Sequence, residues 1–256
     1  MATPQEVLQN LIAPAPVPRL HVTTAQSAAE VNACLRLRYR IFVDELGAHK
    51  TSPQAGLDRD AFDEHCMHLM VRDRVSGQLV GTTRLLTRDG AASANMYYSQ
   101  SEFDLTRILC LPGRFMEIGR TCIDSAYRSS SALAVLWRGL AHIMVAQDID
   151  YLIGCASIPA DPGLSYVATV MTELRRRCYA PEHLRVYPRV PMVCRKTTAS
   201  ESISLPPLLK GYVHSGAMVC GEPAWDEAFN VADVFILLER DRLDRRYARR
   251  FVRRVN

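Results

Sequence analysis

The chain has 256 residues, of which 48% are hydrophobic and 23% are charged, a composition that excludes disordered, collagen-like and low-complexity proteins. Lys and Arg outnumber Asp and Glu by 31 to 27, which gives a net charge of +4. Residues 240–256 hold eight arginines and two aspartates, so the positive charge belongs to the C-terminal end, and the other 239 residues sum to −2.

The first part of the sequence predicts an arm, a helix and two strands. Residues 1–20 are expected to form an N-terminal arm that ends in a stiff, proline-rich linker. Ser27-Ala-Ala-Glu30 is a capping box, and it predicts a helix that ends by Gly47. Residues 68–73 and 78–87 have the pattern of two strands joined by a turn, and the residues from 88 to 101 are expected to be a loop.

The rest of the sequence alternates between strands and helices. Strands are predicted over 115–124, 150–157 and 231–238, and helices after a serine cap at 129–131, over 164–178 and over 241–254. This alternation predicts an α/β (α+β) fold, in which one mixed central sheet is flanked by helices. We expect a single domain of residues 21–239, followed by a basic, amphipathic C-terminal helix within residues 240–256.

Membrane and secretory segments are not expected. The sequence has no run of 18 apolar residues, and prolines interrupt the N-terminal apolar stretch, which also lacks preceding basic residues. The eight cysteines include no Cys-x-x-Cys pair, so a zinc site is not predicted and reduced, buried thiols in a cytoplasmic protein are favoured.

A candidate anion-binding turn follows the predicted strand at 115–124. The chain turns there into a helix start rich in small residues, Arg128-Ser-Ser-Ser131, where backbone N–H groups favour a phosphate. Strand and turn resemble the central strand and pyrophosphate loop of the Gcn5-related N-acetyltransferase (GNAT) superfamily. Ser131 and Leu133 stand where that loop usually has glycine and a small residue, so we expect a carrier-bound donor rather than free acyl-CoA.

Further segments extend the resemblance from about Leu37 to Leu238. Together they resemble the L-ornithine Nα-acyltransferases of ornithine lipid biosynthesis. The resemblance implies transfer of a (3-hydroxy)acyl chain from acyl carrier protein to the α-amine of L-ornithine, which gives lyso-ornithine lipid. Acyl-homoserine lactone synthases and N-acyl amino acid synthases share some of these features and remain alternatives. The segments are Leu37-Arg-Tyr-Arg-Ile-Phe-Val-Asp-Glu45, Phe62-Asp63, His68-Leu, Val80-Gly-Thr-Thr-Arg84, Glu102-Phe-Asp, Glu117-Ile-Gly-Arg120, Leu136-Trp-Arg-Gly139, Gly154-Cys-Ala-Ser157, Pro206-Pro-Leu-Leu-Lys-Gly-Tyr212 and Phe229-Asn-Val-Ala-Asp233.

No bound cofactor is implied, since the phosphopantetheine arm arrives on the carrier protein. The resemblance assigns contact with this arm to Ile118 and to the turn Arg128, Ser129, Ser130 and Ser131. No metal ligands are expected. Cys122 and Cys155 are not predicted to be nucleophiles, because direct attack by the amine makes a covalent intermediate unnecessary.

Amide formation from a thioester requires a neutral amine, so a group must accept the proton of the substrate ammonium. Glu45, at the end of the first predicted helix, and His68, at the start of a strand, are the candidate bases. A histidine is suited to proton transfer near neutral pH without a shifted pKa, whereas a glutamate needs a raised one. The alternative without a catalytic role is that Glu45 is a solvated acid at a helix end and that His68 is a buried, hydrogen-bonded histidine. The sequence does not choose between the two candidate bases.

Charged residues inside predicted strands are the other candidates. Arg84, Glu117 and Arg120 either form a purely structural network or bind the substrate carboxylate and orient the base, with Glu117 counted among the catalytic residues. Glu117 and Arg120 lie three positions apart, so they face opposite sides of a strand unless a bulge intervenes, and the resemblance implies one. Arg40 and Asp63 are assigned to substrate binding from the matched segments, and the acidic stretch around Asp63 would attract ornithine's amines.

The arginine-rich end has three competing interpretations. Leu243, Tyr247, Phe251 and Val255 recur at four-residue spacing, which predicts one apolar stripe with basic flanks. This helix could pack on the protein, lie on an anionic membrane through Arg240 to Arg254, or dock acyl carrier protein. Nucleic acid is not expected as a partner. We expect a cytoplasmic enzyme, with peripheral binding to the inner membrane as a variant; a non-catalytic basic protein that binds membranes or nucleic acid is the rival from another class.

Overall fold

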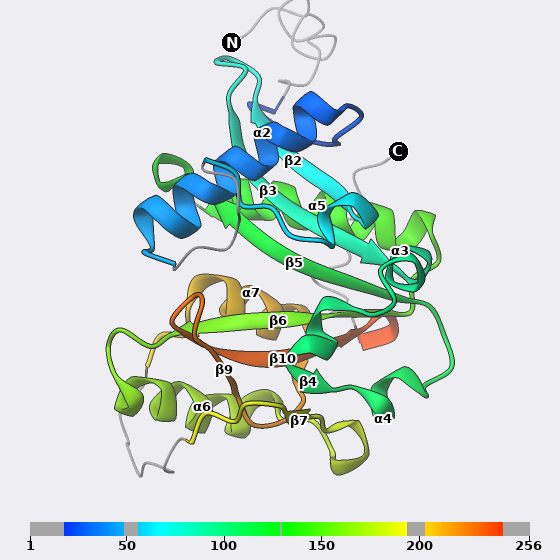
Figure 1. The fold of residues 1–256 in the computed structure, drawn as a ribbon, viewed down its shortest axis with the longest axis vertical. Helices are drawn as coiled ribbons and strands as arrows, with labels where there is room; N and C mark the ends of the chain where they lie inside the picture. Colours follow the sequence, from blue (N-terminus) through cyan, green and yellow to red (C-terminus); the bar gives the residue numbers. More distant parts are fainter. Residues whose placement is uncertain (1–17, 49–55, 129, 194–202, 243–256) are drawn as a thin grey trace, which may run out of the picture.

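The computed structural model describes residues 18–48, 56–128, 130–193 and 203–242 (Figure 1). Within these ranges, eight strands form one sheet in the order β1-β2-β3-β5-β6-β10-β8, with β9 also paired to β10. Neighbouring strands are antiparallel except β5 and β6, which are parallel. The strands are β1 (Leu20–Thr24), β2 (Met67–Asp73), β3 (Leu79–Thr87), β5 (Phe115–Ile123), β6 (Tyr151–Pro159), β8 (Met218–Val219), β9 (Ala224–Asp226) and β10 (Val231–Glu239).

Helices cover both faces of the sheet. Figure 1 shows α2 in front of strands β2 and β3 and α5 behind them. The core on the α5 side also includes apolar residues of α6 and α7, and the opposite core is closed by the segment that holds α3, α4 and the small sheet β4–β7. The elements are α2 (Ala28–Tyr39), α3 (Arg88–Ser93), α4 (Thr106–Leu109), α5 (Ser130–Ala146), α6 (Leu164–Cys178), α7 (Pro207–Ser215), β4 (Phe103–Asp104) and β7 (Tyr187–Pro188).

Short helical turns complete the chain. A π-helix, Arg40–Glu45, continues α2, and single 3-10 turns lie at Asp63–His65, Tyr98–Ser101, Ser125–Tyr127, Glu182–Leu184 and Arg240–Arg242.

The mixed sheet with flanking helices confirms the predicted fold class. The predicted strands and the helix over 164–178 agree with the structure to within two residues at each end. The helix from the capping box is α2, in which the Ser27 hydroxyl accepts the Glu30 N–H, but it passes into the π-helix after Tyr39. The loop expected from 88 to 101 was wrong in part: Thr87 caps the short helix α3, and a 3-10 turn follows it.

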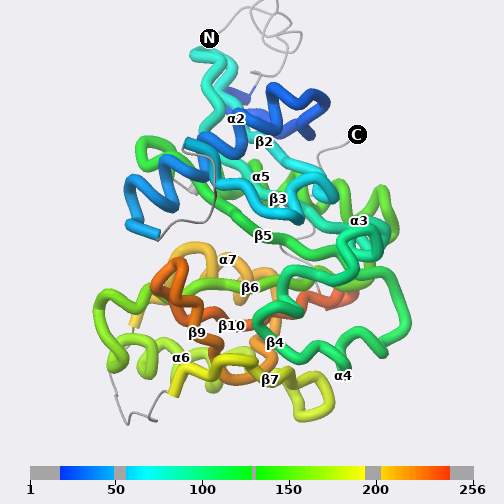
Figure 2. The backbone as a smooth tube through the Cα atoms, viewed as in Figure 1, coloured from blue at the N-terminus to red at the C-terminus, as the bar shows by residue number. Residues whose placement is uncertain are grey.

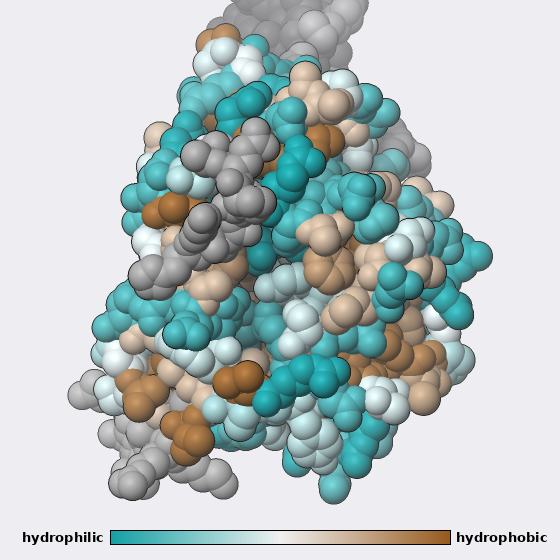
Figure 3. Space-filling view, viewed as in Figure 1, coloured by the Kyte–Doolittle hydropathy of each residue, from teal (hydrophilic) through white to brown (hydrophobic). Residues whose placement is uncertain are grey.

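Strand β1 and helix α7 were not predicted as elements. Leu20, placed in the predicted arm, is already the first residue of β1 and pairs with Asp73. Residues 1–17 of the arm, Ser129 of the turn and residues 243–256 of the predicted basic helix lie outside the described residues. No helix in the described ranges has both the length and the hydrophobicity needed to cross a membrane. Figure 3 shows a largely hydrophilic face on which hydrophobic side chains form small, separate groups.

The junction of β5 and β6 determines where the site lies. The two strands pair only at three positions, Phe115 with Tyr151, Met116 with Leu152 and Glu117 with Ile153. Beyond Glu117 they diverge, as Figure 1 shows. Gly154 occupies the point of divergence, where a Cβ atom would lie 2.3 Å from the carbonyl oxygen of Ile118. Glycine is therefore required there, because any side chain would force the two strands apart where they still touch.

Candidate active site

A cavity of about 300 Å³ opens where β5 and β6 diverge. Its walls come from both strands, from the turn between β9 and β10, from the π-helix after α2 and from the start of α7. Both charged or polar groups and apolar or aromatic side chains line it. The lining residues that bear on the argument are Phe42, Arg84, Tyr98, Ile118, Arg120, Cys155, Ser157, Tyr212, Asp226, Phe229 and Asp233.

A β-bulge directs Arg120 toward this cavity. Between Thr82 and Arg84 of β3 the partner strand β5 contains one extra residue, so Thr83 lies opposite both Arg120 and Thr121. Arg120 takes a positive φ of 51°, and the Thr83 hydroxyl donates to the carbonyl oxygen of Gly119 at 3.1 Å. The bulge anticipated from the sequence is therefore present, and it places Arg120 on the same face of the sheet as Arg84.

Arg84 and Arg120 belong to a buried network of three arginines and three aspartates. Arg84 Nη1 lies 2.5 Å from Asp60 Oδ1 and 3.1 Å from Asp63 Oδ1. Arg120 Nη2 lies 3.4 Å from Asp60 Oδ2. Asp60 thereby joins the two arginine side chains, and Arg84 also lines the cavity.

Arg38 of α2 completes the network. It is fully buried and binds Asp58 and Asp63 at 2.7 and 2.6 Å, respectively. Three positive and three negative charges therefore cancel within one cluster, which we call the Arg–Asp network (Arg38, Arg84, Arg120, Asp58, Asp60, Asp63). Burial alone would raise the pKa of Asp63, but the charges of Arg38 and Arg84 outweigh burial and lower this pKa to about 2.

His68 lies behind the network rather than at the cavity wall. Its ring is 2% exposed, and Nε2 lies 3.2 Å from the backbone oxygen of Asp63. Burial lowers the pKa of His68, so the imidazole is neutral at pH 7. His68 therefore contacts the loop that carries Asp63, and reaches the cavity only through the network.

Glu117 positions the turn that carries Tyr98. Its carboxylate accepts the N–H groups of Tyr98 and Ser99 at 2.6 and 2.7 Å and also the Ser99 hydroxyl. The Tyr98 ring lies 5.4 Å from the guanidinium carbon of Arg84 and 5.0 Å from that of Arg120. Glu117 is buried, which raises its pKa despite these hydrogen bonds. Glu117 is not among the residues that line the cavity, whereas Tyr98, whose N–H it binds, is.

A separate group of predicted residues lies around the start of α5. Glu45 pairs with Arg128, and Arg40 pairs with Asp124 at 2.5 Å with half of its side chain exposed. None of these four side chains lines the cavity. Arg128 also donates to the Ile123 carbonyl oxygen at 3.1 Å, and Ser130 begins α5 with Ser131 next to it. The structure therefore places Glu45 and Arg40 beside the predicted donor-binding turn rather than with Asp63, Arg84 and Arg120.

Arg38 is the site residue that the sequence reasoning missed most plainly. Cys34, Arg38 and Ile41 are buried at helical spacing of four and three, so Arg38 falls on the buried face of its helix whereas Arg40 does not. That periodicity was the available signal. Tyr98 had no comparable signal, because it lies in the segment expected to be a loop.

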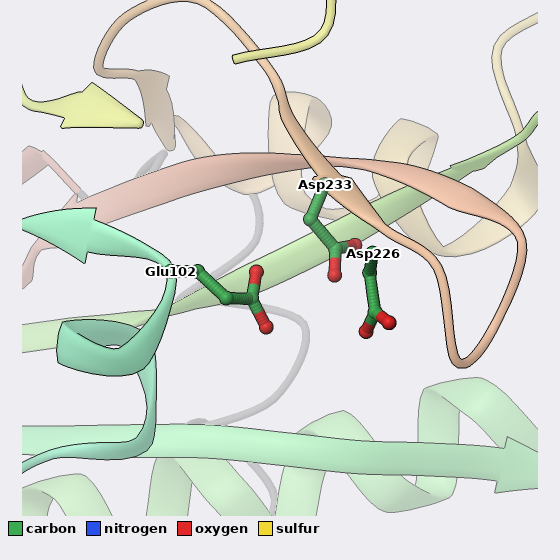
Figure 4. Close-up of side chains that lie close together, drawn as sticks. All are labelled: Glu102, Asp226 and Asp233. Atoms are coloured by element: carbon green, nitrogen blue, oxygen red, sulfur yellow. The ribbon is translucent and has the colours of Figure 1, made fainter. Parts of the chain in front are cut away.

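Three carboxylates form a second charged cluster beside the cavity. Glu102 follows the 3-10 turn at Tyr98–Ser101, Asp226 ends β9, and Asp233 lies on β10. Figure 4 shows the three side chains pointing toward one another from these three segments. Each offers an oxygen within 4.8 Å of the others. We call this group the acidic cluster (Glu102, Asp226, Asp233).

Comparison with known proteins identifies the family. A family model described as an acetyltransferase (GNAT) domain matches residues 37–138. The L-ornithine N(alpha)-acyltransferase of Brucella abortus is 35% identical over 249 residues, which cover 89% of this chain and 87% of that protein. The corresponding protein of Rhizobium meliloti is 36% identical over 253 residues and covers 90% of this chain and 83% of its own length.

Solved structures share the fold. FeeM, an N-acyl amino acid synthase from uncultured soil microbes, superposes with a TM-score of 0.54 at 12% identity, over 89% of this chain and 95% of FeeM. BjaI, a CoA-dependent acyl-homoserine lactone synthase, gives a TM-score of 0.51 at 15% identity, over 91% and 89% of the two chains.

The divergent central strands and the family match define an N-acyltransferase of the GNAT type. Within that class, the chain belongs to the L-ornithine N(alpha)-acyltransferase family. The predicted superfamily, the predicted family and the prediction of an acyltransferase are thereby confirmed.

Proposed function

We propose that this enzyme transfers a (3-hydroxy)acyl chain from acyl carrier protein to the α-amine of L-ornithine and releases lyso-ornithine lipid. The observation that carries the proposal is the cavity at the divergence of β5 and β6, with arginines and carboxylates on its walls. An amino acid has a carboxylate and at least one ammonium group, so this distribution of charge suits it. The names of the relatives supply L-ornithine as the particular acceptor.

The gap between the strands suits an extended donor. No ladder pair joins β5 to β6 beyond Glu117 and Ile153. An extended phosphopantetheine arm has amide groups that can pair with backbone in such a gap, as an added strand does. Ile118, at the wall of the cavity, is then adjacent to the arm. No cofactor of the enzyme's own is needed, because the donor brings the arm.

Direct attack of the amine on the thioester fits the cysteine at the site. Cys155 lines the cavity, but burial raises the pKa of its thiol well above the usual value. A neutral thiol is a poor nucleophile, so an acyl-cysteine intermediate is disfavoured. In the proposed step the nitrogen lone pair attacks the thioester carbon, the carrier thiol leaves, and the amine proton passes to a base.

Of the two predicted bases, we propose His68. It is neutral and contacts Asp63 of the network that borders the cavity, whereas Glu45 is held by Arg128 outside the cavity. His68→Ala is expected to lower kcat by about 100-fold, with a smaller effect for Glu45→Ala. Steady-state kinetics and a melting curve of each variant check this. Full turnover in His68→Ala would remove His68 from the proton path.

Product analysis tests the function directly. Purified enzyme is incubated with 3-hydroxyacyl carrier protein and an equimolar mixture of amino acids, and the products are identified by mass. The expected product is Nα-acylornithine. A dominant product from another amino acid would instead make the chain an N-acyl amino acid synthase, and formation of a lactone would make it an acyl-homoserine lactone synthase.

The donor is tested separately. The same acyl chain is presented on acyl carrier protein and on CoA, and kcat/KM is compared at saturating L-ornithine. We expect the carrier protein to be preferred, because Ser131 and Leu133 replace the small residues of the usual pyrophosphate loop. An equal or higher kcat/KM with acyl-CoA would contradict the proposed donor while leaving the acceptor unaffected.

A further inference from the structure

The acidic cluster is not neutralised within the described part of the protein. No Arg, Lys or His side chain in those ranges lies within ion-pair distance of Glu102, Asp226 or Asp233. Arg120 is close enough to lower the pKa of Asp233, but its own ion pairs are with Asp58 and Asp60. Three acids therefore face one another without a matching cation, in contrast to the Arg–Asp network nearby.

Hydrogen bonding leaves part of the cluster unsatisfied. Asp226 accepts the N–H groups of Ala228 and Phe229 at 2.9 and 3.2 Å. Among the described residues, Asp233 Oδ1 and both oxygens of Glu102 make no hydrogen bond of ordinary geometry. The side chains of Cys155 and Tyr98 near Glu102, and of Ser157 near Asp233, only partly offset the effect of burial on the two pKa values. Asp233 is 4% exposed and lines the cavity. A buried, unpaired carboxylate at a cavity wall is costly unless a ligand supplies the missing positive charge.

The protonation behaviour is consistent with a missing cation. Burial, together with the charge of Asp233, raises the pKa of Glu102 to about 9. Burial and the charge of Asp226 raise the pKa of Asp233 to about 6. A bound cation would reverse both effects, because an opposite charge favours the ionised form.

We propose that the acidic cluster binds the side-chain ammonium of the amino acid acceptor and thereby selects dibasic amino acids. The inference rests on the proposed function, which it deepens by assigning the residues that recognise the acceptor. It concerns the amine that does not react. Carboxylates around an ammonium hold it protonated, whereas the attacking α-amine must lose its proton, so the two amines need different surroundings.

The other charged wall of the cavity suits the remaining groups of the acceptor. Arg84 and Arg120 line the same cavity as Asp226 and Asp233. A guanidinium binds a carboxylate with two hydrogen bonds, and Arg120 Nε makes no hydrogen bond in the described residues, only a long ion-pair contact of 3.6 Å with Asp58. An amino acid with its carboxylate toward Arg120 and its side-chain ammonium in the acidic cluster leaves the α-amine free to face the gap between β5 and β6.

A divalent cation is the other ligand that three carboxylates attract. Mg²⁺ and Ca²⁺ take six or more oxygen ligands in all. Here one wall of the cavity is formed by the rings of Tyr98 and Phe229. We therefore commit to the ammonium group, and metal binding becomes an outcome that would overturn the proposal.

The test compares L-ornithine with L-norvaline, which has the same carbon chain but lacks the side-chain amine. Wild-type enzyme is expected to prefer L-ornithine by about 100-fold or more in kcat/KM, because norvaline leaves the buried carboxylates unpaired. Asp233→Asn and Glu102→Gln are each expected to reduce this preference at least tenfold, mainly through a higher KM for L-ornithine. Glu227→Gln, which changes an exposed acid beside Asp226, is the matched control and should keep the wild-type preference.

Calorimetric titration without the acyl donor tests the acidic cluster independently of the proposed acyl transfer. L-Ornithine, L-norvaline and MgCl₂ or CaCl₂ alone are titrated into wild type, Asp233→Asn and Glu227→Gln. Binding of L-ornithine that is lost in Asp233→Asn supports the inference, even where acyl transfer fails and the proposed function is wrong. Equal use or equal binding of norvaline, tight binding of metal alone at the cluster, or a kcat loss in Glu102→Gln that is the same for both amino acids would overturn it.

Discussion

The two charged clusters beside the cavity solve the problem of burying charge in different ways. In the Arg–Asp network, three arginines and three aspartates neutralise one another through contacts as short as 2.5 Å. In the acidic cluster, three carboxylates converge without a basic partner among the described residues. The first cluster is complete in the free enzyme, so it stabilises and positions the surrounding loops. The second is incomplete, which is the property expected of a binding site for a cation.

Removing one charge from the Arg–Asp network should have the largest effect on stability. Asp63→Asn leaves the buried Arg38 and Arg84 short of one negative charge, and we expect a loss of about 3–5 kcal/mol in the free energy of unfolding. Denaturant unfolding at pH 7 measures it. Glu64→Gln, at the exposed neighbouring position, is the control and should stay near wild type. A loss in Asp63→Asn no larger than in this control would show that the network does not stabilise the fold.

Removing charge from the acidic cluster should instead increase the free energy of unfolding. The pKa of Asp233 is raised to about 6 and that of Glu102 to about 9, so the folded state retains protons that the unfolded state releases. The stability of the wild type is therefore expected to fall, through this cluster, as pH rises from about 4 to 9. Glu102→Gln with Asp233→Asn removes this loss, and the double variant should be more stable than wild type by on the order of 2 kcal/mol at pH 8.

Unfolding curves of wild type and double variant at pH 4.5, 6, 7 and 8 check this prediction, and the gap should widen with pH. Saturating L-ornithine should narrow it by stabilising only the wild type. A gap that is independent of pH would mean that the carboxylates are neutralised by groups other than a ligand.

The pH response of the complete cluster should sharpen the contrast. The pKa of Asp63 is lowered to about 2, so its contribution to stability is full above about pH 4 and is lost as the pH falls toward 2. The difference in stability between wild type and Asp63→Asn should therefore shrink in acid, because protonation removes a stabilising charge. The difference between wild type and the double variant also shrinks in acid, but there protonation of Glu102 and Asp233 removes destabilising charges. A difference for Asp63→Asn that is unchanged between pH 5 and pH 2.5 would contradict the assignment.

Exposed charges should give a much smaller effect than either cluster. Arg40 pairs with Asp124 while half of its side chain is exposed. Arg40→Gln is therefore expected to lower the free energy of unfolding by less than about 1 kcal/mol. Because Arg40 does not line the cavity, kcat should change less than in Arg120→Gln. Comparable losses of kcat in the two variants would instead support the sequence-based prediction that Arg40 binds the substrate.

The arginine-rich end should give the smallest effect on stability. Arg240 pairs with Asp148 and Asp150 at 2.5 and 2.8 Å, and Arg242 pairs with Glu239, so these two arginines are neutralised within the protein. The four arginines 245, 246, 249 and 250 lie outside the described residues. Their replacement by glutamine should leave Tm within about 2 °C of wild type.

The same variant should bind acyl carrier protein or anionic liposomes more weakly, and added salt should weaken binding of the wild type in the same way. Arg240→Gln is the control, because its charge is already paired. A large drop in Tm with unchanged binding to both partners would mean that the segment serves the fold.

Local sequence patterns predicted the elements well and the site only in part. Capping residues and apolar periodicity are local, so the sheet, α2 and α6 could be anticipated, and the spacing of Glu117 and Arg120 made a bulge necessary if both were to face one site. The sequence prediction named Arg40 but not Arg38, although helical periodicity places Arg38 on the buried face of α2. The acidic cluster could not be found this way: Glu102 lies more than 120 residues before Asp226 and Asp233, and only the tertiary fold brings them together.

The order of strands in the sheet also has a consequence for biosynthesis. Figure 2 shows most of the first half of the chain, blue to green, in the upper part of the molecule, and most of the second half, through yellow to red, in the lower part, where β4 and α4 of the first half also lie. Strands β1, β2, β3 and β5 pair with neighbours in order along the chain, whereas β10, the last strand, lies between β6 and β8. Local antiparallel contacts form early and long-range ones late.

The cavity wall that carries Asp233 is therefore absent until the ribosome has released the last strand. An incomplete chain presents the backbone edge of β6, which β10 later pairs with over nine residue positions. The edge of β6 therefore stays unpaired, and open to pairing with another chain, until β10 has been synthesised.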